Sequence, residues 1–159
     1  MKKIRAAVVG YGNIGHYTVQ ALEAAPDFEI AGIVRRHGAE GKPQELSAYE
    51  VVKDIRELKD VDVAILATPT RSCEEYARQI VPLGINTVDS FDIHQQISQY
   101  RSDMMPICRE HGRVGDCRRM GPGLRLDSAR AAAEPCPQRA VVHQLRPRHV
   151  DGPQRVRAL

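Results

Sequence analysis

The sequence predicts an α/β protein whose strands form a doubly wound parallel sheet. Short apolar segments alternate with amphipathic ones through residues 1–112, and this alternation favours parallel strands joined by right-handed helical crossovers. The first apolar segment runs directly into Gly-x-Gly-x-x-Gly at residues 10–15, which is typical of the first strand–helix junction of such sheets. Ligands of these sheets lie at the carboxyl ends of the strands, so the loops there are the candidate site.

Four strands and four helical segments are expected within residues 1–112. The strands are Ile4–Val9, Phe28–Val34, Val61–Ala67 and Asn86–Asp89. The helical segments are Ile14–Ala25, Tyr49–Leu58, Cys73–Leu83 and Ile93–His111, and Gly38–Ser47 is expected to be a polar loop. The third strand is almost continuously apolar, as in a buried parallel strand. Gly84 and Gly112 are expected to end the last two helices.

The glycine turn has the residue types that a dinucleotide pyrophosphate requires. Gly10 permits a tight turn, Gly12 lets the backbone approach the phosphates, and Gly15 lets the helix pack closely on the strand. The start of that helix then offers free N–H groups and a partial positive charge to an anion. The alternative is a glycine turn with a purely structural role.

The end of the second strand indicates which dinucleotide is bound. NAD-binding domains usually have Asp or Glu there to accept a hydrogen bond from the ribose 2′-hydroxyl, whereas this chain has Arg35 and Arg36. Guanidinium groups suit a 2′-phosphate because they form charge-assisted, often bidentate hydrogen bonds. The pair therefore favours NADP(H) over NAD(H), with a solvated basic turn as the alternative.

Two further strand ends carry polar residues. The segment Val88–His94 contains two carboxylates and an imidazole. Ser90 or Asp92 is placed to cap the next helix, or Asp92 faces the cleft and holds an ammonium group or receives a proton. The loop Thr68–Arg71 is either a simple turn or lies along the nicotinamide ribose.

Composition excludes several other classes. No apolar run approaches the length of a membrane span, and the short first strand, interrupted by Arg5 and glycines, is not a signal peptide. The four cysteines have no metal-type spacing and no paired framework, which indicates reduced thiols, no metal site and a cytoplasmic location. They are Cys73, Cys108, Cys117 and Cys136.

Residues 113–159 differ sharply from the rest. They hold ten arginines, no lysine, four acidic residues and half of the ten prolines, a net charge of +6, whereas residues 1–112 have a net charge of −3. Such a segment is typical of a disordered, basic, nucleic-acid-binding arm. A second explanation follows from a family resemblance.

Four segments carry that resemblance: Gly10–Gly15, Arg35-Arg36, Ala67–Thr70 and Thr87–His94. Together they resemble the meso-diaminopimelate dehydrogenase family over about residues 3–112, and the Val-Asp-Ser-Phe-Asp-x-His run is the most specific of them. The resemblance implies a Rossmann NADP-binding domain and oxidation of the D-centre of meso-2,6-diaminopimelate to L-2-amino-6-oxopimelate, with release of ammonia and NADPH. It also implies a homodimer, a small-molecule substrate and a place in lysine biosynthesis.

The resemblance also implies the residue roles. Tyr11–Ile14 would hold the pyrophosphate, Val34–Arg36 the 2′-phosphate, and Asp92 the amine at the D-centre, with Tyr76 at the edge of the same cleft. The full set expected to bind the cofactor is Gly10, Tyr11, Gly12, Asn13, Ile14, Gly15, Val34, Arg35, Arg36, Ala67, Thr68, Pro69, Thr70, Ser90, Phe91 and Asp92. Asp92 is the expected catalytic residue, and Asp92 and Tyr76 are the expected substrate contacts.

The resemblance stops near Gly112. The family continues with a β-strand, then Gly-Trp-Asp-Pro-Gly and later Phe-Gly-Pro-Gly-Met-Ser-Met-Gly-His-Ser, and none of these is expected after Gly112 in this sequence. With chosen synonymous codons, a one-nucleotide shift converts Arg118–Gly123 into Ala-Gly-Trp-Asp-Pro and Gln144–Gln154 into Asn-Phe-Gly-Pro-Gly-Met-Ser-Met-Gly-His. Residues from about 113–116 onward are therefore expected to be an out-of-frame, irregular tail rather than a nucleic-acid-binding arm.

This expectation has consequences for activity. The family's substrate and dimerisation domain would be missing, so the chain as written is expected to give little or no turnover. Two alternatives remain: another NADP-dependent reductase, of dihydrodipicolinate-reductase-like or sugar-dehydrogenase-like type, and a non-catalytic nucleotide-binding module.

Overall fold

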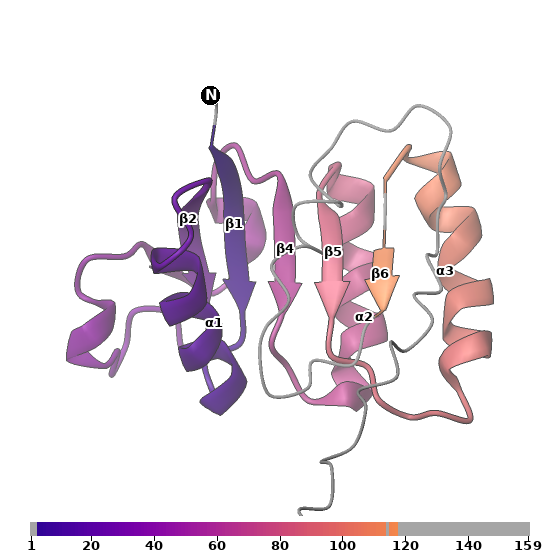
Figure 1. Cartoon of the computed structure of the whole chain (residues 1–159), viewed down its shortest axis with the longest axis horizontal. Coiled ribbons are helices and arrows are strands. Elements are labelled where there is room, and N and C mark those ends of the chain that lie inside the picture. Colours follow the sequence, from indigo (N-terminus) through magenta and orange to yellow (C-terminus); the bar gives the residue numbers. More distant parts are fainter. Residues whose placement is uncertain (1–2, 114, 118–159) are drawn as a thin grey trace, which may run out of the picture.

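A single parallel sheet forms the centre of the computed structural model, which describes residues 3–113 and 115–117. Its six strands are β1 (Ile4–Val9), β2 (Phe28–Val34), β3 (Val51–Val52), β4 (Val63–Leu66), β5 (Asn86–Asp89) and β6 (Gly115–Cys117). They lie in the order β3-β2-β1-β4-β5-β6, and all neighbouring pairs are parallel (Figure 1). The first strand lies inside the sheet and the chain extends it in both directions, so the predicted doubly wound fold is confirmed.

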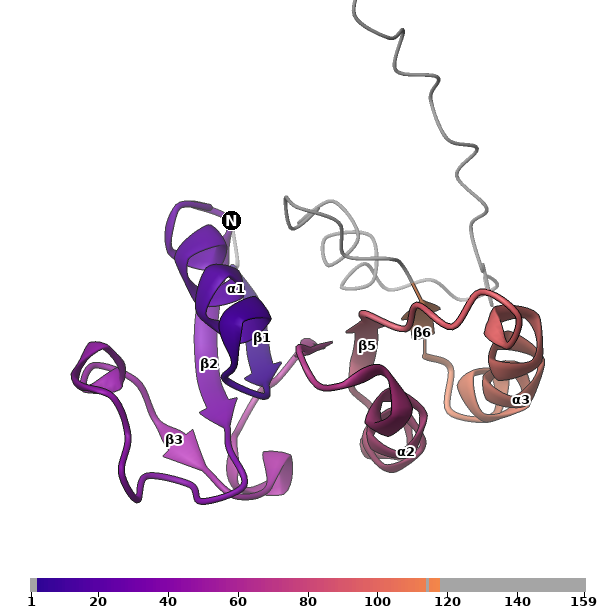
Figure 2. The same ribbon diagram turned by 90° about the horizontal axis from the view of Figure 1, so that it is seen from below.

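Helices cover both faces of this sheet. The α-helices are α1 (Asn13–Glu23), α2 (Thr70–Ile80) and α3 (Ile97–Glu110), and the short 3₁₀ helices are η1 (Gln44–Leu46), η2 (Ile55–Glu57) and η3 (Val81–Leu83). Helix α1 lies on one face, and α2 and α3 lie on the other (Figures 1 and 2). No helix within the described ranges is both long and apolar enough to cross a membrane.

Strand β1 shows why both faces are buried. Its side chains alternate between two hydrophobic clusters: Ala7 and Val9 pack on the face of α2 and α3, and Ala6 and Val8 pack on the face of α1. All four are at most 2% exposed. An apolar strand without a polar face is the pattern expected of a parallel sheet covered on both sides.

The strand register brings three loops together. Val9 lies opposite Val34 of β2 and opposite Leu66 of β4, so these three strands end at the same level. The residues that follow, Gly10, Arg35 and Ala67, therefore begin their loops side by side. Backbone hydrogen bonds join these ends, since Gly10 N–H donates to Val34 O at 2.9 Å and Ala67 N–H donates to Val9 O at 2.8 Å.

Several predicted boundaries are wrong. The short helical segment predicted within Tyr49–Leu58 is present as η2, but the edge strand β3 before it was not predicted. This strand forms because Val51 pairs with Ile33 of β2. Helix α3 begins at Ile97 rather than Ile93, and α2 begins at Thr70 rather than Cys73. The predicted stop at Gly84 is confirmed, since it ends η3 with a left-handed φ of 81°.

The expectation that the irregular tail begins at about residues 113–116 is wrong at its start, because the sheet continues beyond Gly112. In β6, Gly115 lies opposite Thr87 and Cys117 lies opposite Asp89 of β5. The expectations for the rest of the tail, including Cys136 and the two recovered motifs, fall on residues 118–159 and lie outside the described residues.

Candidate functional site

A cleft of ≈ 420 Å³ lies at the carboxyl ends of β1, β2, β3 and β4. Its lining comes from the glycine turn, the loop after β2, the residue after β3, the loop after β4 and helix α2. The lining residues are Gly10, Tyr11, Gly12, Val34, Arg35, Arg36, His37, Lys53, Ala67, Thr68, Pro69, Ser72 and Tyr76. Most of the residues predicted to bind the cofactor therefore converge on one cleft.

The three glycines of the turn have three different surroundings. Gly10 has a φ of 95°, and a Cβ there would lie 2.6 Å from Ala67 O. A Cβ on Gly15 would lie 2.2 Å from Gly10 O, because α1 packs directly on the turn. A Cβ on Gly12 would meet nothing within 4 Å, so only this glycine borders open space. Gly10 and Gly15 are needed for the fold, and Gly12 leaves room for a ligand.

Helix α1 presents its N-terminus at this cleft. Gly12 is its N-cap, and no side chain in the described part of the chain caps it. Asn13 and Ile14 at its first positions are exposed. Unpaired N–H groups and the positive end of the helix dipole attract an anion.

The arginine pair after β2 divides into two roles. The Arg35 guanidinium donates to Gly38 O at 3.2 Å and to Gly41 O at 3.5 Å, which closes its own loop. The Arg36 side chain is exposed, and neither arginine forms an ion pair with a described carboxylate. The cleft thus carries positive charge that the described residues do not neutralise.

Lys53, His37 and Ser72 also line the cleft and were not among the predicted binding residues. Lys53 was not predicted because no strand was expected within Tyr49–Leu58, whereas β3 ends at Val52 and places Lys53 beside Arg35. The Arg35 N–H donates to Val52 O at 2.9 Å, which fixes this adjacency. The sequence signal was Val-Val-Lys, an apolar pair followed by a cation.

A polar cluster joins the glycine turn to the loop after β2. Tyr11 O–H donates to Glu45 Oε1 at 2.6 Å, and His16 Nδ1 lies 3.1 Å from Tyr11 Oη and 3.3 Å from the same carboxylate oxygen. Burial and the hydrogen bond to Glu45 raise the pKa of Tyr11 to about 12. The Tyr11 hydroxyl in turn lowers the pKa of Glu45.

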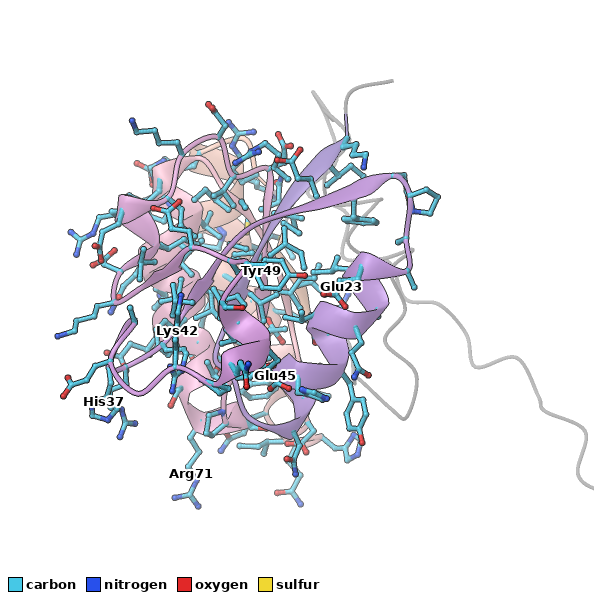
Figure 3. All side chains as sticks on the ribbon, turned by 90° about the vertical axis from the view of Figure 1, so that its left-hand side faces the viewer. Glu23, His37, Lys42, Glu45, Tyr49 and Arg71 are labelled. Carbon is cyan, nitrogen blue, oxygen red and sulfur yellow. The ribbon has the colours of Figure 1, made fainter. Side chains whose placement is uncertain are left out.

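A second contact of the same kind lies further along α1. The Tyr49 hydroxyl donates to Glu23 at the end of that helix, and Figure 3 shows both side chains, with Glu45 nearby on η1. Burial and this hydrogen bond raise the pKa of Tyr49 to about 12. Residues 44–49 are therefore attached to the glycine turn through the Tyr11–Glu45 contact and to α1 through the Tyr49–Glu23 contact.

The segment after β5 is organised differently. Asp89 is 1% exposed and accepts from Tyr100 O–H at 2.6 Å and from Phe91 N–H at 3.0 Å. The rings of Phe91 and Tyr100 stack with centroids 4.6 Å apart. Asp89 therefore serves the packing of α3 against the sheet.

The capping roles considered for Ser90 and Asp92 are wrong, because α3 begins at Ile97 with Gln96 as its N-cap. Ser90 O–H donates to Thr68 O at 3.3 Å and lies 3.4 Å from Leu66 O. Asp92 is exposed and accepts from Thr70 O–H at 2.6 Å. These bonds tie the loop after β5 to the loop after β4. Predicted site residues outside the lining of the cleft are Asn13, Ile14, Gly15, Thr70, Ser90, Phe91 and Asp92.

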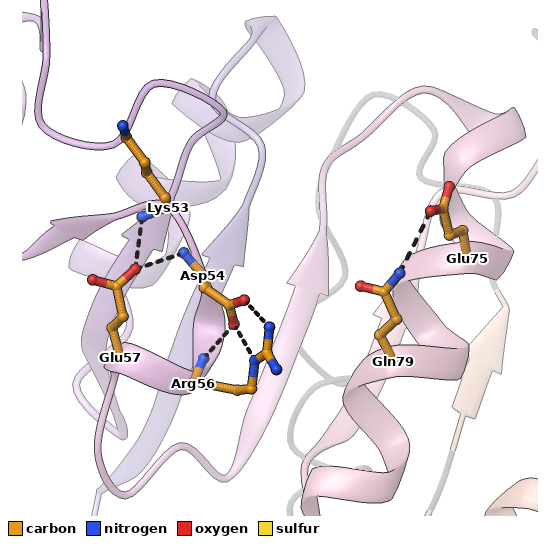
Figure 4. Close-up of polar contacts among 6 residues, drawn as sticks. All are labelled: Lys53, Asp54, Arg56, Glu57, Glu75 and Gln79. Carbon is orange, nitrogen blue, oxygen red and sulfur yellow. Dashed lines mark hydrogen bonds and ion pairs between the residues drawn. The ribbon is translucent and has the colours of Figure 1, made fainter.

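A second groove of ≈ 440 Å³ adjoins the cleft and shares Val34, Lys53 and Tyr76 with it. It runs between η2 and α2. Figure 4 shows its polar rims: Asp54 pairs with Arg56 on one side, and Gln79 contacts Glu75 on the other. Tyr76 of α2 therefore borders both the cleft and this groove.

In the described part of the chain, His, Cys, Asp and Glu form no group of three that could hold a metal ion. Cys73 and Cys108 are buried, and burial raises the pKa of the Cys73 thiol.

Comparison with known proteins agrees with this geometry. The sequence model of the oxidoreductase family with an NAD-binding Rossmann fold matches residues 4–88, more than half of the chain. A meso-diaminopimelate D-dehydrogenase of Bacteroides fragilis is 66% identical over 114 residues, which is 72% of this chain and 38% of that protein. The chain thus spans less than two fifths of this curated relative.

Two solved structures are similar in fold and sequence. An engineered D-amino acid dehydrogenase bound to NADP⁺ has 27% identity and a TM-score of 0.61, covering 73% of this chain and 36% of its own. Corynebacterium glutamicum DAP dehydrogenase in complex with DAP has 28% identity and a TM-score of 0.61, with the same coverage. The resemblance inferred from the four sequence segments is confirmed.

Proposed function

The chain belongs to the oxidoreductase family with an NAD-binding Rossmann fold, and we propose that residues 1–112 are the NADP(H)-binding unit of a meso-diaminopimelate dehydrogenase. The observation that carries the proposal is the cleft in which the open Gly12, the N-terminus of α1 and the cationic Arg36 meet. A pyrophosphate fits the first two and a 2′-phosphate fits the third. The 66% identity to the Bacteroides fragilis enzyme supports the same assignment.

Each part of the cleft has a separate task in this proposal. The turn Gly10–Gly15 holds the pyrophosphate through backbone N–H groups, and Arg36 holds the 2′-phosphate. The loops Ala67–Thr70 and Ser90–Asp92 line the path toward the nicotinamide, because they follow the next two strands of the sheet. When bound, NADP⁺ accepts a hydride from the carbon that carries the amine.

Asp92 is the proposed contact for the substrate. Its carboxylate is exposed and positioned by Thr70, so it has capacity to accept further hydrogen bonds from an ammonium group of meso-2,6-diaminopimelate. Holding that amine orients the D-centre for oxidation, and water then supplies the carbonyl oxygen of L-2-amino-6-oxopimelate as the nitrogen leaves as ammonia. Tyr76 is proposed as a further residue at the edge of the cleft.

The remaining proposals concern the whole enzyme. They are a cytoplasmic homodimer with a small-molecule substrate in lysine biosynthesis, and no nucleic acid or membrane partner. Residues 113–159 are proposed to be separate from the nucleotide-binding unit, apart from β6, which adds a strand to its sheet.

Direct binding of dinucleotides to the full chain tests the proposal. NADPH and NADH are titrated into the protein and followed by the fluorescence of the reduced nicotinamide, and we expect NADPH to bind at least about tenfold more tightly. Arg36→Gln should remove most of this preference, while the matched variant Arg109→Gln should keep it, because Arg109 is exposed on α3 and does not line the cleft. Equal affinity for both dinucleotides in the unmodified chain would contradict the NADP assignment.

A further inference from the structure

Lys53 follows strand β3 and adds a positive charge to the end of the cleft that Arg35 and Arg36 line. It follows β3, whose last residue Val52 pairs with Val34, so Lys53 stands beside Arg35. Lys53, Arg35, Arg36 and His37 all line the same cleft. A 2′-phosphate carries between one and two negative charges near neutral pH, so one free guanidinium matches it only in part.

The stem of Lys53 is held against the arginine turn. Gly38 has a φ of 57°, and a Cβ there would lie 2.9 Å from Lys53 Cγ and 3.5 Å from Cε. The absence of a side chain at Gly38 therefore lets the lysine stem lie directly on the turn that begins at Arg35. This contact limits the directions in which the ammonium can extend.

The acidic neighbours of Lys53 are already engaged. Glu57 Oε1 accepts from the backbone N–H groups of Lys53 and Asp54 at 3.2 and 2.9 Å, and Asp54 pairs with Arg56. Figure 4 shows the Lys53 ammonium extending away from both carboxylates. The ammonium makes no ion pair with another described residue.

Arg35, by contrast, already donates to two carbonyls of its own loop. We infer that Arg36 and Lys53, rather than the two arginines, are the pair of cations that hold the 2′-phosphate, and that Lys53 is a determinant of dinucleotide specificity. Arg35 then acts as a positioning residue that shapes the turn. The inference rests on the proposed NADP binding and names the groups responsible for the preference.

The test compares Lys53→Gln with Lys42→Gln, which removes a lysine that is exposed on the loop after β2 (Figure 3) and does not line the cleft. We expect Lys53→Gln to weaken NADPH binding about tenfold while NADH binding changes less than about twofold, because only NADPH carries the extra phosphate. Lys42→Gln should change neither affinity appreciably, and Lys53→Arg should retain the preference for NADPH.

The outcomes separate the two proposals. If the unmodified chain prefers NADPH and Lys53→Gln keeps the full preference, the role of Lys53 is overturned while NADP binding stands. Equal weakening of NADPH and NADH binding would likewise overturn it, since that result indicates a general structural role. An unmodified chain without a preference for NADPH overturns the NADP assignment, and the role of Lys53 with it.

Discussion

The polar groups at the carboxyl ends of the strands are arranged differently on the two sides of β1. On the side of β2 and β3, which we call the open side, polar groups at the strand ends face the cleft. They are the N-terminus of α1, Arg36 and Lys53. On the side of β4 and β5, which we call the closed side, the polar groups are paired with one another, as in the Asp89–Tyr100 and Ser90–Thr68 contacts. The first side is the proposed site for an anion, and the second is a hydrogen-bonded scaffold that carries the exposed carboxylate of Asp92.

This difference teaches that one sheet edge serves both binding and stability. Open cations and N–H groups contribute little to folding because water already solvates them. Buried pairs such as Asp89–Tyr100 stabilise the fold because leaving a buried acceptor without its donor is costly. Substitutions on the two sides should therefore affect different measurements.

The largest effect on stability is expected in the glycine turn of the open side, where Gly15 and Gly12 should respond differently to substitution. Gly15→Ala places a Cβ 2.2 Å from Gly10 O and should lower the free energy of unfolding by about 3 kcal/mol. Gly12→Ala meets no atom within 4 Å and should cost less than about 1 kcal/mol, yet weaken NADPH binding. Urea unfolding and dinucleotide titration measure both quantities, and a stable Gly15→Ala variant would contradict the packing argument.

The next largest effect is a loss of folding stability on the closed side, and it should leave NADPH binding unchanged. Tyr100→Phe keeps the ring that stacks on Phe91 but removes the donor to the buried Asp89, and should destabilise the fold by about 2 kcal/mol. Tyr17→Phe is the matched control because Tyr17 is 66% exposed, and it should change stability by less than about 0.5 kcal/mol. A loss of NADPH affinity in Tyr100→Phe at full stability would show that the two sides are not separate.

The contact between Glu45 and the glycine turn can be tested by titrating Tyr11. The pKa of Tyr11 is raised to about 12, so its contribution to stability is fully present below pH 10 and lost as the pH rises toward 12. Glu45→Gln should lower the pKa of Tyr11 toward 10.0 and leave that of Tyr49 near 12, because Glu23 acts on Tyr49. Carbon-13 NMR of the tyrosine Cζ atoms, assigned with Tyr11→Phe, measures this, and an unchanged Tyr11 would refute the contact.

The carboxyl side of the same contact has the opposite sign. Hydrogen bonding lowers the pKa of Glu45 below 4.5, so its contribution is present above that pH and is lost as the pH falls through the lowered value. Unfolding curves of the unmodified chain and Glu45→Gln should therefore converge in acid.

The smallest effect is expected at the surface of α2. Arg78 donates to Glu74 at 2.7 Å one helical turn away, with side chains 41% and 37% exposed. Arg78→Gln should change the free energy of unfolding by less than about 0.5 kcal/mol. A larger loss in urea unfolding would mean that the closed side also depends on its surface charges.

Local rules predicted the open side well. The six residues of the glycine turn predict its geometry, because their glycines constrain the backbone. The arginine pair could be located because it directly follows a predicted strand. Lys53 was missed because β3 has only Val51 and Val52, too short to show a strand period, and its strand conformation comes from pairing with β2. Tertiary pairing, not local preference, decided that segment.

The closed side could be predicted only in part. Asp92 is prominent in the sequence, but its partner Thr70 is 22 residues away, and no local pattern joins them. The four residues by which the start of α3 was misplaced reflect the same problem, since Asp89 turns back to Tyr100 and Phe91 instead of allowing an immediate helix. Hydrogen bonds across the sheet set this loop.

The central place of β1 has a consequence for synthesis on the ribosome. Translation produces β1 before either neighbour, yet β1 pairs with both β2 and β4. A nascent chain that has not yet released residues 63–66 leaves one edge of this apolar strand unpaired, in a state that invites chaperones or aggregation. The strand that lies between the two halves of the sheet is thus synthesised first, and it waits longest for its second partner.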